Sequence, residues 1–121
     1  MSKTALVVDD STSMRQMVTF TLQSAGFETL EGGNGAEALK VSDGKSVALV
    51  VTDLNMPEMD GITLIKELRS RPAFKFTPIL MLTTETQDAK KQEGKAAGAT
   101  GWMVKPFNPE QLLAVVNKVV R

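Results

Sequence analysis

Three residue types are missing from this chain of 121 residues: cysteine, histidine and tyrosine. Without cysteine there can be no disulfide, no thiolate nucleophile and no thiolate metal site. Without histidine there is no imidazole base, no histidine-ligated zinc and no residue that could itself carry phosphohistidine. The chemistry of this chain must therefore rest on other side chains.

The chain also lacks an excess of charge and any long apolar stretch. Its formal net charge is zero, so no strongly basic surface indicates binding to nucleic acid or anionic lipid. No apolar run is long enough to cross a bilayer, and the run at residues 5–8 is too short for a signal peptide. The length is typical of one domain with its own core. We therefore expect one cytoplasmic domain over residues 1–121, with no membrane insertion, no nucleic-acid partner and no attached output domain.

Three continuous apolar runs predict buried strands, at residues 5–8, 48–51 and 79–82. None of them alternates polar with apolar residues, a pattern typical of parallel strands that helices cover on both faces. Two shorter candidates occupy residues 27–30 and 101–104.

Helical patterns fall between these strands. They begin after the N-cap candidates Ser11, Asn34 and Asn108, near Ile62, and near residue 87. Capping boxes are predicted at Asn34–Glu37 and Asn108–Gln111, and helix ends at Gly26, before Pro72 and at Gly98. The pattern over residues 87–97 is mostly polar, so we expect that helix to be weakly held by Ala89, Ala96 and Ala97.

The order is therefore five strand–helix units, and right-handed crossovers make a doubly wound open parallel sheet the simplest α/β fold, (βα)₅. A barrel of eight such units would need about 250 residues. In the last helix, Leu113 and Val120 add a second apolar seam to the inner stripe. That seam is either part of a wide buried stripe or a partner surface.

Polar residues stand where four of these strands end. Asp9 and Asp10 follow the first strand, Asp53 lies just beyond the third, Thr83 ends the fourth and Lys105 follows the fifth. Because the carboxyl ends of parallel strands meet at one edge of a sheet, we expect these side chains to lie together. Adjacent carboxylates are tolerated when they share a cation or take up protons.

This set of groups suits phosphoryl transfer that depends on Mg²⁺. Asp53 can accept a phosphoryl group as an acyl phosphate. Asp10, Asp53 and a loop carbonyl offer the oxygen ligands that Mg²⁺ prefers. Lys105 and the Thr83 hydroxyl can neutralise and hydrogen-bond the remaining oxygens. Each residue alone is more often a helix cap or a turn former, and their coincidence at four strand ends favours the functional interpretation.

Four segments resemble the receiver domains of two-component response regulators, most closely those of stand-alone chemotaxis regulators. They are Val7-Val8-Asp9-Asp10-Ser11, Asp53-Leu54-Asn55-Met56-Pro57-Glu58-Met59-Asp60-Gly61, Leu82-Thr83 and Lys105-Pro106-Phe107. The resemblance spans essentially the whole chain and implies the flavodoxin-like arrangement of the doubly wound sheet.

The resemblance also implies a role for each site residue. Asp53 would be the phosphoacceptor and a Mg²⁺ ligand, Asp10 a direct Mg²⁺ ligand, Asp9 its acidic neighbour that reaches the metal through water, and Asn55 a ligand through its backbone carbonyl. Lys105 would contact the phosphoryl group, Thr83 would be the switch hydroxyl, and Asn55 and Glu85 would influence the hydrolysis rate. Trp102 occupies the place of an aromatic residue that rotates inward on phosphorylation. An indole is larger than the usual occupant, so Trp102 is equally a rim residue that anchors the last two helices.

By the same resemblance, a histidine kinase would be the phosphoryl donor and a downstream protein such as the flagellar motor switch the target, with a phosphatase as a further possible partner. The chain would be a signalling protein and not an enzyme, although it would assist its own phosphorylation and slow autodephosphorylation. A phosphate sink or relay shuttle is the alternative role. A phosphatase of the haloacid-dehalogenase type needs an acid where this chain has Asn55, and a flavin phosphate would be repelled by Asp9 and Asp10.

Overall fold

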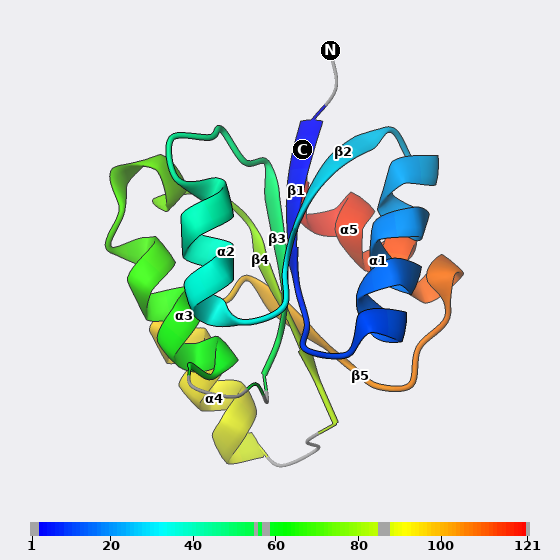
Figure 1. Ribbon diagram of the computed structural model, residues 1–121. Coiled ribbons are helices and arrows are strands. Elements are labelled where there is room, and N and C mark those ends of the chain that lie inside the picture. The colour runs from blue at the N-terminus through cyan, green and yellow to red at the C-terminus, as the bar shows by residue number, and fades with distance from the viewer. Residues whose placement is uncertain (1–2, 55, 57–58, 85–87, 121) are drawn as a thin grey trace.

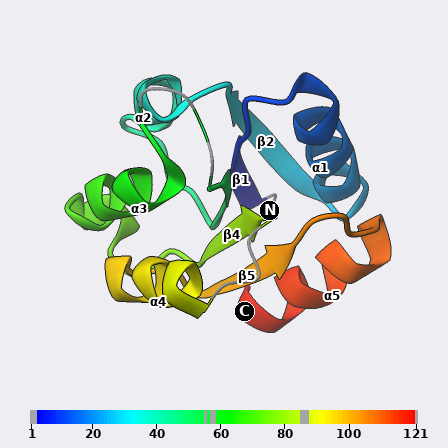
Figure 2. The same cartoon turned by 90° about the horizontal axis from the view of Figure 1, so that it is seen from below.

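The computed structural model describes residues 3–54, 56, 59–84 and 88–120. The strands are β1 (Lys3–Val8), β2 (Phe27–Gly32), β3 (Leu49–Asp53), β4 (Ile79–Thr83) and β5 (Gly101–Val104). The helices are α1 (Thr12–Ser24), α2 (Gly35–Ser42), α3 (Gly61–Arg69), α4 (Asp88–Ala97) and α5 (Pro109–Val119), with a 3₁₀ turn η1 (Pro72–Phe74) between α3 and β4. Helices α2, α3 and α4 cover one face of the sheet, and α1 and α5 cover the other (Figures 1 and 2).

The five strands form one parallel sheet in the order β2-β1-β3-β4-β5, so the predicted doubly wound, flavodoxin-like (βα)₅ fold is confirmed. The chain first winds outward from β1 to β2 and then crosses back to β3 on the other side of β1. This reversal leaves the carboxyl ends of β1 and β3 side by side, with Val8 paired to Thr52. A reversal of this kind is where open α/β sheets place their ligand sites.

The core consists of two apolar layers, one on each face of the sheet. In β1, Leu6 and Val8 pack toward α2 and α3, whereas Ala5 and Val7 pack toward α1 and α5. All residues of β3 and β4 are buried. Because side chains alternate between the faces of a strand, a strand buried on both faces needs the continuous apolar run that the sequence showed.

The three predicted N-caps are confirmed by hydrogen bonds in the first turns of their helices. Ser11 and Asn34 accept from the third residue beyond them, and Asn108 forms the complete predicted capping box with Gln111. The box expected at Asn34 is only half formed, because Glu37 accepts from the Gly33 N–H at 3.2 Å and not from the N-cap itself.

Helices α4 and α5 differ in how firmly they are attached. Of the three anchors expected in α4, Ala89 and Ala96 are exposed and only Ala97 packs on the core. Gly94 is buried instead, and a Cβ there would lie 2.5 Å from the Met81 sulfur, so the absence of a side chain lets α4 approach the sheet.

In α5, Leu112 and Val116 are fully or almost fully buried. Val120 packs against the same layer, which favours the wide buried stripe for that half of the predicted seam. Leu113 is half-buried. In the part of the chain that the structure describes, no helix has the length and apolar content to cross a membrane.

Candidate functional site

Asp53 is the last residue of β3, the central strand of the sheet, and is paired with Leu82 of β4. The apolar run had placed it one residue beyond the strand, so the strand is longer than expected. The carboxylate is buried. Its Oδ1 accepts a hydrogen bond from the Leu54 backbone N–H at 2.9 Å and from Lys105 Nζ at 3.1 Å. Asp53 is thus held at a fixed position at the carboxyl edge.

Lys105 joins two strand ends that are far apart in the sequence. Its Nζ lies 3.1 Å from Asp53 Oδ1 and 3.2 Å from Asp9 Oδ2. The other oxygen of Asp9 accepts from the Ser11 N–H at 2.9 Å, so both oxygens of Asp9 are engaged within the protein. Asp10, the next residue, is exposed. One ammonium therefore serves two buried carboxylates, and a third carboxylate lies beside them at the surface.

The acidic surroundings act on the titration of Asp53. Burial raises the pKa of Asp53, and the nearby carboxylate of Asp9 raises it further. Lys105 and the Leu54 N–H act in the opposite direction, but they do not cancel the rise. The site therefore favours any change that reduces its negative charge, such as protonation or the binding of a cation.

Oxygen atoms of Asp9, Asp10 and Asp53 lie within 4.8 Å of one another, close enough to hold one metal ion. Carboxylate oxygens are the ligands that suit Mg²⁺. The cluster thus fits the expected metal, and Asp10, being exposed, is the member best able to bring in an ion from solvent.

The structure also brings Thr83 to this edge. Thr83 is the last residue of β4, is fully buried, and accepts the Lys105 backbone N–H on its carbonyl oxygen at 2.8 Å. The register therefore fixes the strand ends that carry Asp53, Thr83 and Lys105 next to one another.

Two residues that shape the site were not found from the sequence. Arg15 donates to the Asp9 carbonyl oxygen at 2.7 Å and pairs with Glu31 at 3.1 Å, which ties the β1 end to β2. Gly61 starts α3 directly behind Asp53, where an added Cβ would collide with the Asp53 carbonyl oxygen. An isolated arginine in a first turn gives no sequence signal, whereas Gly61 stood in the quoted segment without a role.

Trp102 lies on the edge strand β5 and is 39% exposed. Lys91 of α4 places its Nζ 5.5 Å from the centre of the ring system, within range of a cation–π contact. The indole thus lies at the rim beside α4, outside the acidic cluster. The predicted metal ligand Asn55 and the predicted hydrolysis-tuning residue Glu85 fall outside the described residues.

Comparison with known proteins agrees with this geometry. Residues 5–117 match the family model of the response regulator receiver domain. The chain is 43% identical to chemotaxis protein CheY1 of Helicobacter pylori over 109 residues, which is 88% of each chain. It is also 36% identical to the transcriptional regulatory protein SrrA of Staphylococcus aureus, where it spans about half (49%) of that longer protein.

Among solved structures, that of chemotaxis protein CheY4 of Vibrio cholerae superposes with a TM-score of 0.95 and 52% identity, covering 99% of this chain and 100% of that one. Family match, identity and fold therefore agree: this chain belongs to the response regulator receiver domain family and is CheY-like.

Proposed function

We propose that this chain is a phosphorylation switch of a two-component system, in which Asp53 accepts a phosphoryl group from a histidine kinase and the modified domain changes its contacts with a downstream protein. The observation that carries the proposal is the buried Asp53 carboxylate at the end of a central strand, bonded to Lys105 and beside two further carboxylates. A carboxylate held next to a cation is a suitable nucleophile for phosphoryl transfer.

In the proposed transfer, an oxygen of Asp53 forms a bond to phosphorus while the bond from phosphorus to the donor's imidazole nitrogen breaks. The electron pair of the broken bond stays on that nitrogen, which takes up a proton. Lys105 and the Thr83 hydroxyl would contact the phosphoryl oxygens, since the Lys105 ammonium lies 3.1 Å from Asp53 and Thr83 ends the strand next to it.

Mg²⁺ would be held by Asp10, by Asp53 and by the backbone carbonyl of Asn55, with Asp9 contacting it through water. When bound, it supplies the positive charge that offsets the carboxylates and the incoming phosphoryl group. The acidic cluster of this chain supports this ligand set, because its oxygens already lie within one ion's reach.

The direct test is phosphorylation by acetyl phosphate with Mg²⁺, followed by intact-mass measurement. We expect one added phosphoryl group on the wild-type chain and none on Asp53→Asn, which is nearly isosteric. The matched control is Asp60→Asn, because Asp60 is exposed, caps α3, and Asn caps a helix equally well. Full labelling of Asp53→Asn would refute the proposal.

For the output, we propose that Thr83 relays the change at Asp53 to α4 and Trp102. The weak attachment of α4 and its Lys91–Trp102 contact support this route. Beryllofluoride with Mg²⁺ should shift the emission of Trp102, the sole tryptophan, in wild type. The shift should be reduced in Thr83→Ala and absent in Asp53→Asn. Unchanged emission and unchanged hydrogen exchange in residues 88–104 of the beryllofluoride-bound protein would contradict it.

We further propose that the switch acts in chemotaxis, in the cytoplasm, with the flagellar motor switch as its target. The support is that the similar proteins CheY1 and CheY4 are both named as chemotaxis proteins. The test is expression in a flagellated strain that lacks its own chemotaxis response regulator. Restored switching of swimming direction, lost in Asp53→Asn, is expected, whereas no restoration together with rapid draining of the kinase would indicate a phosphate sink.

Slow loss of the phosphoryl group completes the proposed cycle, with Asn55 and Glu85 setting its rate and a separate phosphatase as a further partner. The decay of the labelled protein measures that rate. Substitution of Glu85 by Ala should change the decay without changing the extent of labelling.

A further inference from the structure

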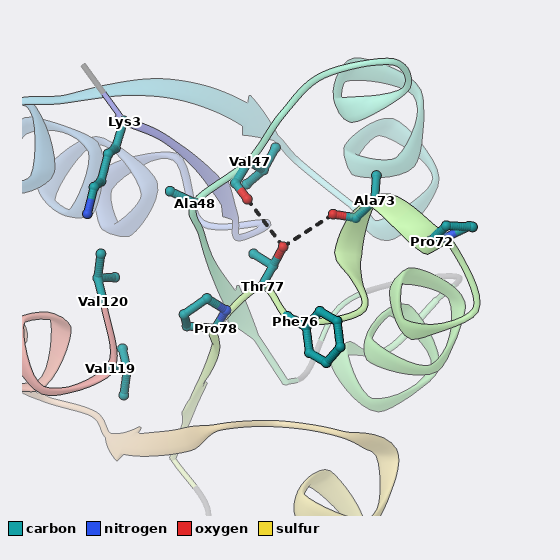
Figure 3. Close-up of a pocket in the computed structure, with 10 residues that line it drawn as sticks. All are labelled: Lys3, Val47, Ala48, Pro72, Ala73, Phe76, Thr77, Pro78, Val119 and Val120. Carbon is teal, nitrogen blue, oxygen red and sulfur yellow. Dashed lines mark hydrogen bonds between the residues drawn. The ribbon is translucent and has the colours of Figure 1, made fainter. Parts of the chain in front are cut away.

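A hollow of about 470 Å³ opens at the amino edge of the sheet, at the end opposite the acidic cluster. Figure 3 shows its walls, which come from the start of β1, the segment before β3, the segment between η1 and β4, and the end of α5. We call this feature the amino-edge hollow and define it by Lys3, Val47, Ala48, Pro72, Ala73, Phe76, Thr77, Pro78, Val119 and Val120. The proposed phosphorylation site makes no use of it.

Phe76 is the most unusual residue of the amino-edge hollow. Its side chain is 87% exposed, although a phenylalanine gains about 1.5–3 kcal/mol when it is fully buried. Lys75 places its Nζ 5.5 Å from the centre of the ring. Single exposed apolar residues are common, and Phe20 on α1 is another, at 74%. Phe76 differs from Phe20 because it stands at the rim of a hollow that has further apolar walls.

The hydroxyl of Thr77, which lines the amino-edge hollow, already has hydrogen-bond partners within the protein. The Thr77 hydroxyl donates to the Val47 carbonyl at 3.2 Å, with the Ala73 carbonyl at 3.5 Å (Figure 3). An apolar side chain that enters the hollow would therefore not leave this hydroxyl without a hydrogen-bond partner.

Cations predominate around the amino-edge hollow. Every described charged residue that lines it, or that adjoins a lining residue in the chain, is a cation: Lys3, Arg71, Lys75 and Lys118. Of these, Arg71 is within 3.9 Å of Asp43, which offsets part of its charge. The last turns of α2, α3, α4 and α5 also carry basic residues, as expected where helix dipoles point their negative ends.

We propose that the amino-edge hollow is a docking site for an acidic segment of a partner protein, whose apolar side chain enters the hollow beside Phe76. The cations complement the acidic residues of such a segment. Its apolar side chain would pack in the hollow against Phe76, as side chains pack on aromatic residues at the centres of interfaces. A second copy of this chain is disfavoured, because the same cations would face one another. A flat membrane would leave the hollow unfilled.

The test titrates the ¹⁵N-labelled protein with a short synthetic peptide of aspartate and glutamate around one central leucine. We expect amide shifts that cluster on Val47, Lys75, Phe76 and Val120, and affinity that falls as salt rises. The same peptide with alanine in place of leucine should bind at least tenfold more weakly. A peptide with lysine in place of the acids should not bind.

Matched variants decide which residue anchors the peptide. Phe76→Ala should weaken binding at least tenfold, whereas Phe20→Ala, which removes another largely exposed phenylalanine, should change it less than twofold. Both changes should leave the melting temperature nearly unaltered, because both rings lie at the surface. Lys75→Glu should weaken binding severalfold.

The proposal is overturned if Phe76→Ala binds like wild type, if the shifts map elsewhere, or if the protein shows no shifts at millimolar peptide. Two further measurements can also overturn it. One is binding to phosphatidylserine vesicles that depends on Phe76 in the absence of peptide binding. The other is a dimer in sedimentation experiments that Phe76→Ala dissociates.

Discussion

The two edges of the sheet each hold a partly buried cation, and the two cations do different work. At the carboxyl edge, Lys105 bridges the carboxylates of Asp9 and Asp53. At the amino edge, Arg69 bridges backbone carbonyls: its Nε and Nη2 donate to Gly98 O at 3.1 and 2.8 Å, and its Nη1 donates to Phe74 O at 2.6 Å. Lys105 neutralises the charge of carboxylates, whereas Arg69 donates hydrogen bonds to uncharged backbone carbonyls.

Because of this difference, the contacts of Lys105 can change with conditions, whereas those of Arg69 cannot. The balance at Lys105 depends on protonation, on metal ions and, in the proposed function, on a phosphoryl group, all of which change the charge of its partners. The carbonyls around Arg69 do not titrate, so its contacts hold α3, η1 and the end of α4 together under all conditions in which the arginine is charged. Burial lowers the pKa of Arg69 from its usual value. The carboxyl edge is thus the variable end of the domain and the amino edge the constant end.

The largest effect should come from removing the cation of the carboxyl edge. Lys105→Met keeps the aliphatic stem but leaves Asp9 and Asp53 facing each other, and we expect a loss of about 3 kcal/mol in unfolding free energy at neutral pH without metal. The loss should shrink as pH falls and the carboxylates take up protons. Urea melts at stepwise pH measure it. Lys75→Met, at an exposed site, should cost under about 0.5 kcal/mol, and a pH-independent loss in Lys105→Met would contradict the comparison.

Mg²⁺ should act on the carboxyl edge with an effect almost as large. A cation that binds the folded form at a hundred times its dissociation constant stabilises it by about 2.7 kcal/mol. Asp10→Ala should lose most of this gain, and its metal-free melting temperature should rise slightly because a repelling charge is gone. Chemical unfolding with Mg²⁺ or with EDTA makes the comparison. An unchanged Mg²⁺ response in Asp10→Ala would show that Asp10 is not a ligand.

Breaking the amino edge should cost somewhat less. Arg69→Lys keeps the charge, but one ammonium cannot reach the carbonyls of both Gly98 and Phe74, so we expect a loss of about 2 kcal/mol. Because no carboxylate is involved, the loss should be the same from mildly acidic to neutral pH and with or without Mg²⁺. Faster hydrogen exchange at the end of α4 should accompany it. A loss that varies with pH or Mg²⁺ would remove the contrast between the two edges.

The smallest effect is a gain. The folded-state pKa of Asp53 is raised, so its contribution to stability is present below the ordinary value of 3.8 and is lost as pH rises through the raised pKa. Asp53→Asn cannot ionise and should therefore melt a few °C higher than wild type at neutral pH without metal, with no gain below about that ordinary value. Circular dichroism melts across this range test it, with Asp60→Asn as the unchanged control.

The sequence predicted the carboxyl edge far better than the amino edge. Asp9, Asp53, Thr83 and Lys105 were found because each follows an apolar run, and parallel strands bring their ends together. That Lys105 bonds both carboxylates could not be predicted, because it depends on where a long side chain reaches.

At the amino edge no pattern marks the contacts. Arg69 was not singled out in the sequence, and it lies in the last turn of α3. The carbonyls that it binds belong to Gly98 and Phe74, which lie near predicted helix ends. The 3₁₀ turn η1 was missed because Pro72 signalled only the end of the preceding helix. Every residue has a backbone carbonyl, so the sequence does not indicate which carbonyls a side chain will contact.

Lys3, Val119 and Val120 line one side of the amino-edge hollow, so both ends of the described chain lie beside it (Figure 3). An affinity tag or a fused domain attached at either end would start its path beside the amino-edge hollow. It would be held at high effective concentration over the hollow and would compete with any free peptide there. Fusions at the two ends should therefore block one edge of this domain and leave Asp53, at the opposite edge, accessible to the phosphoryl donor that we propose for it.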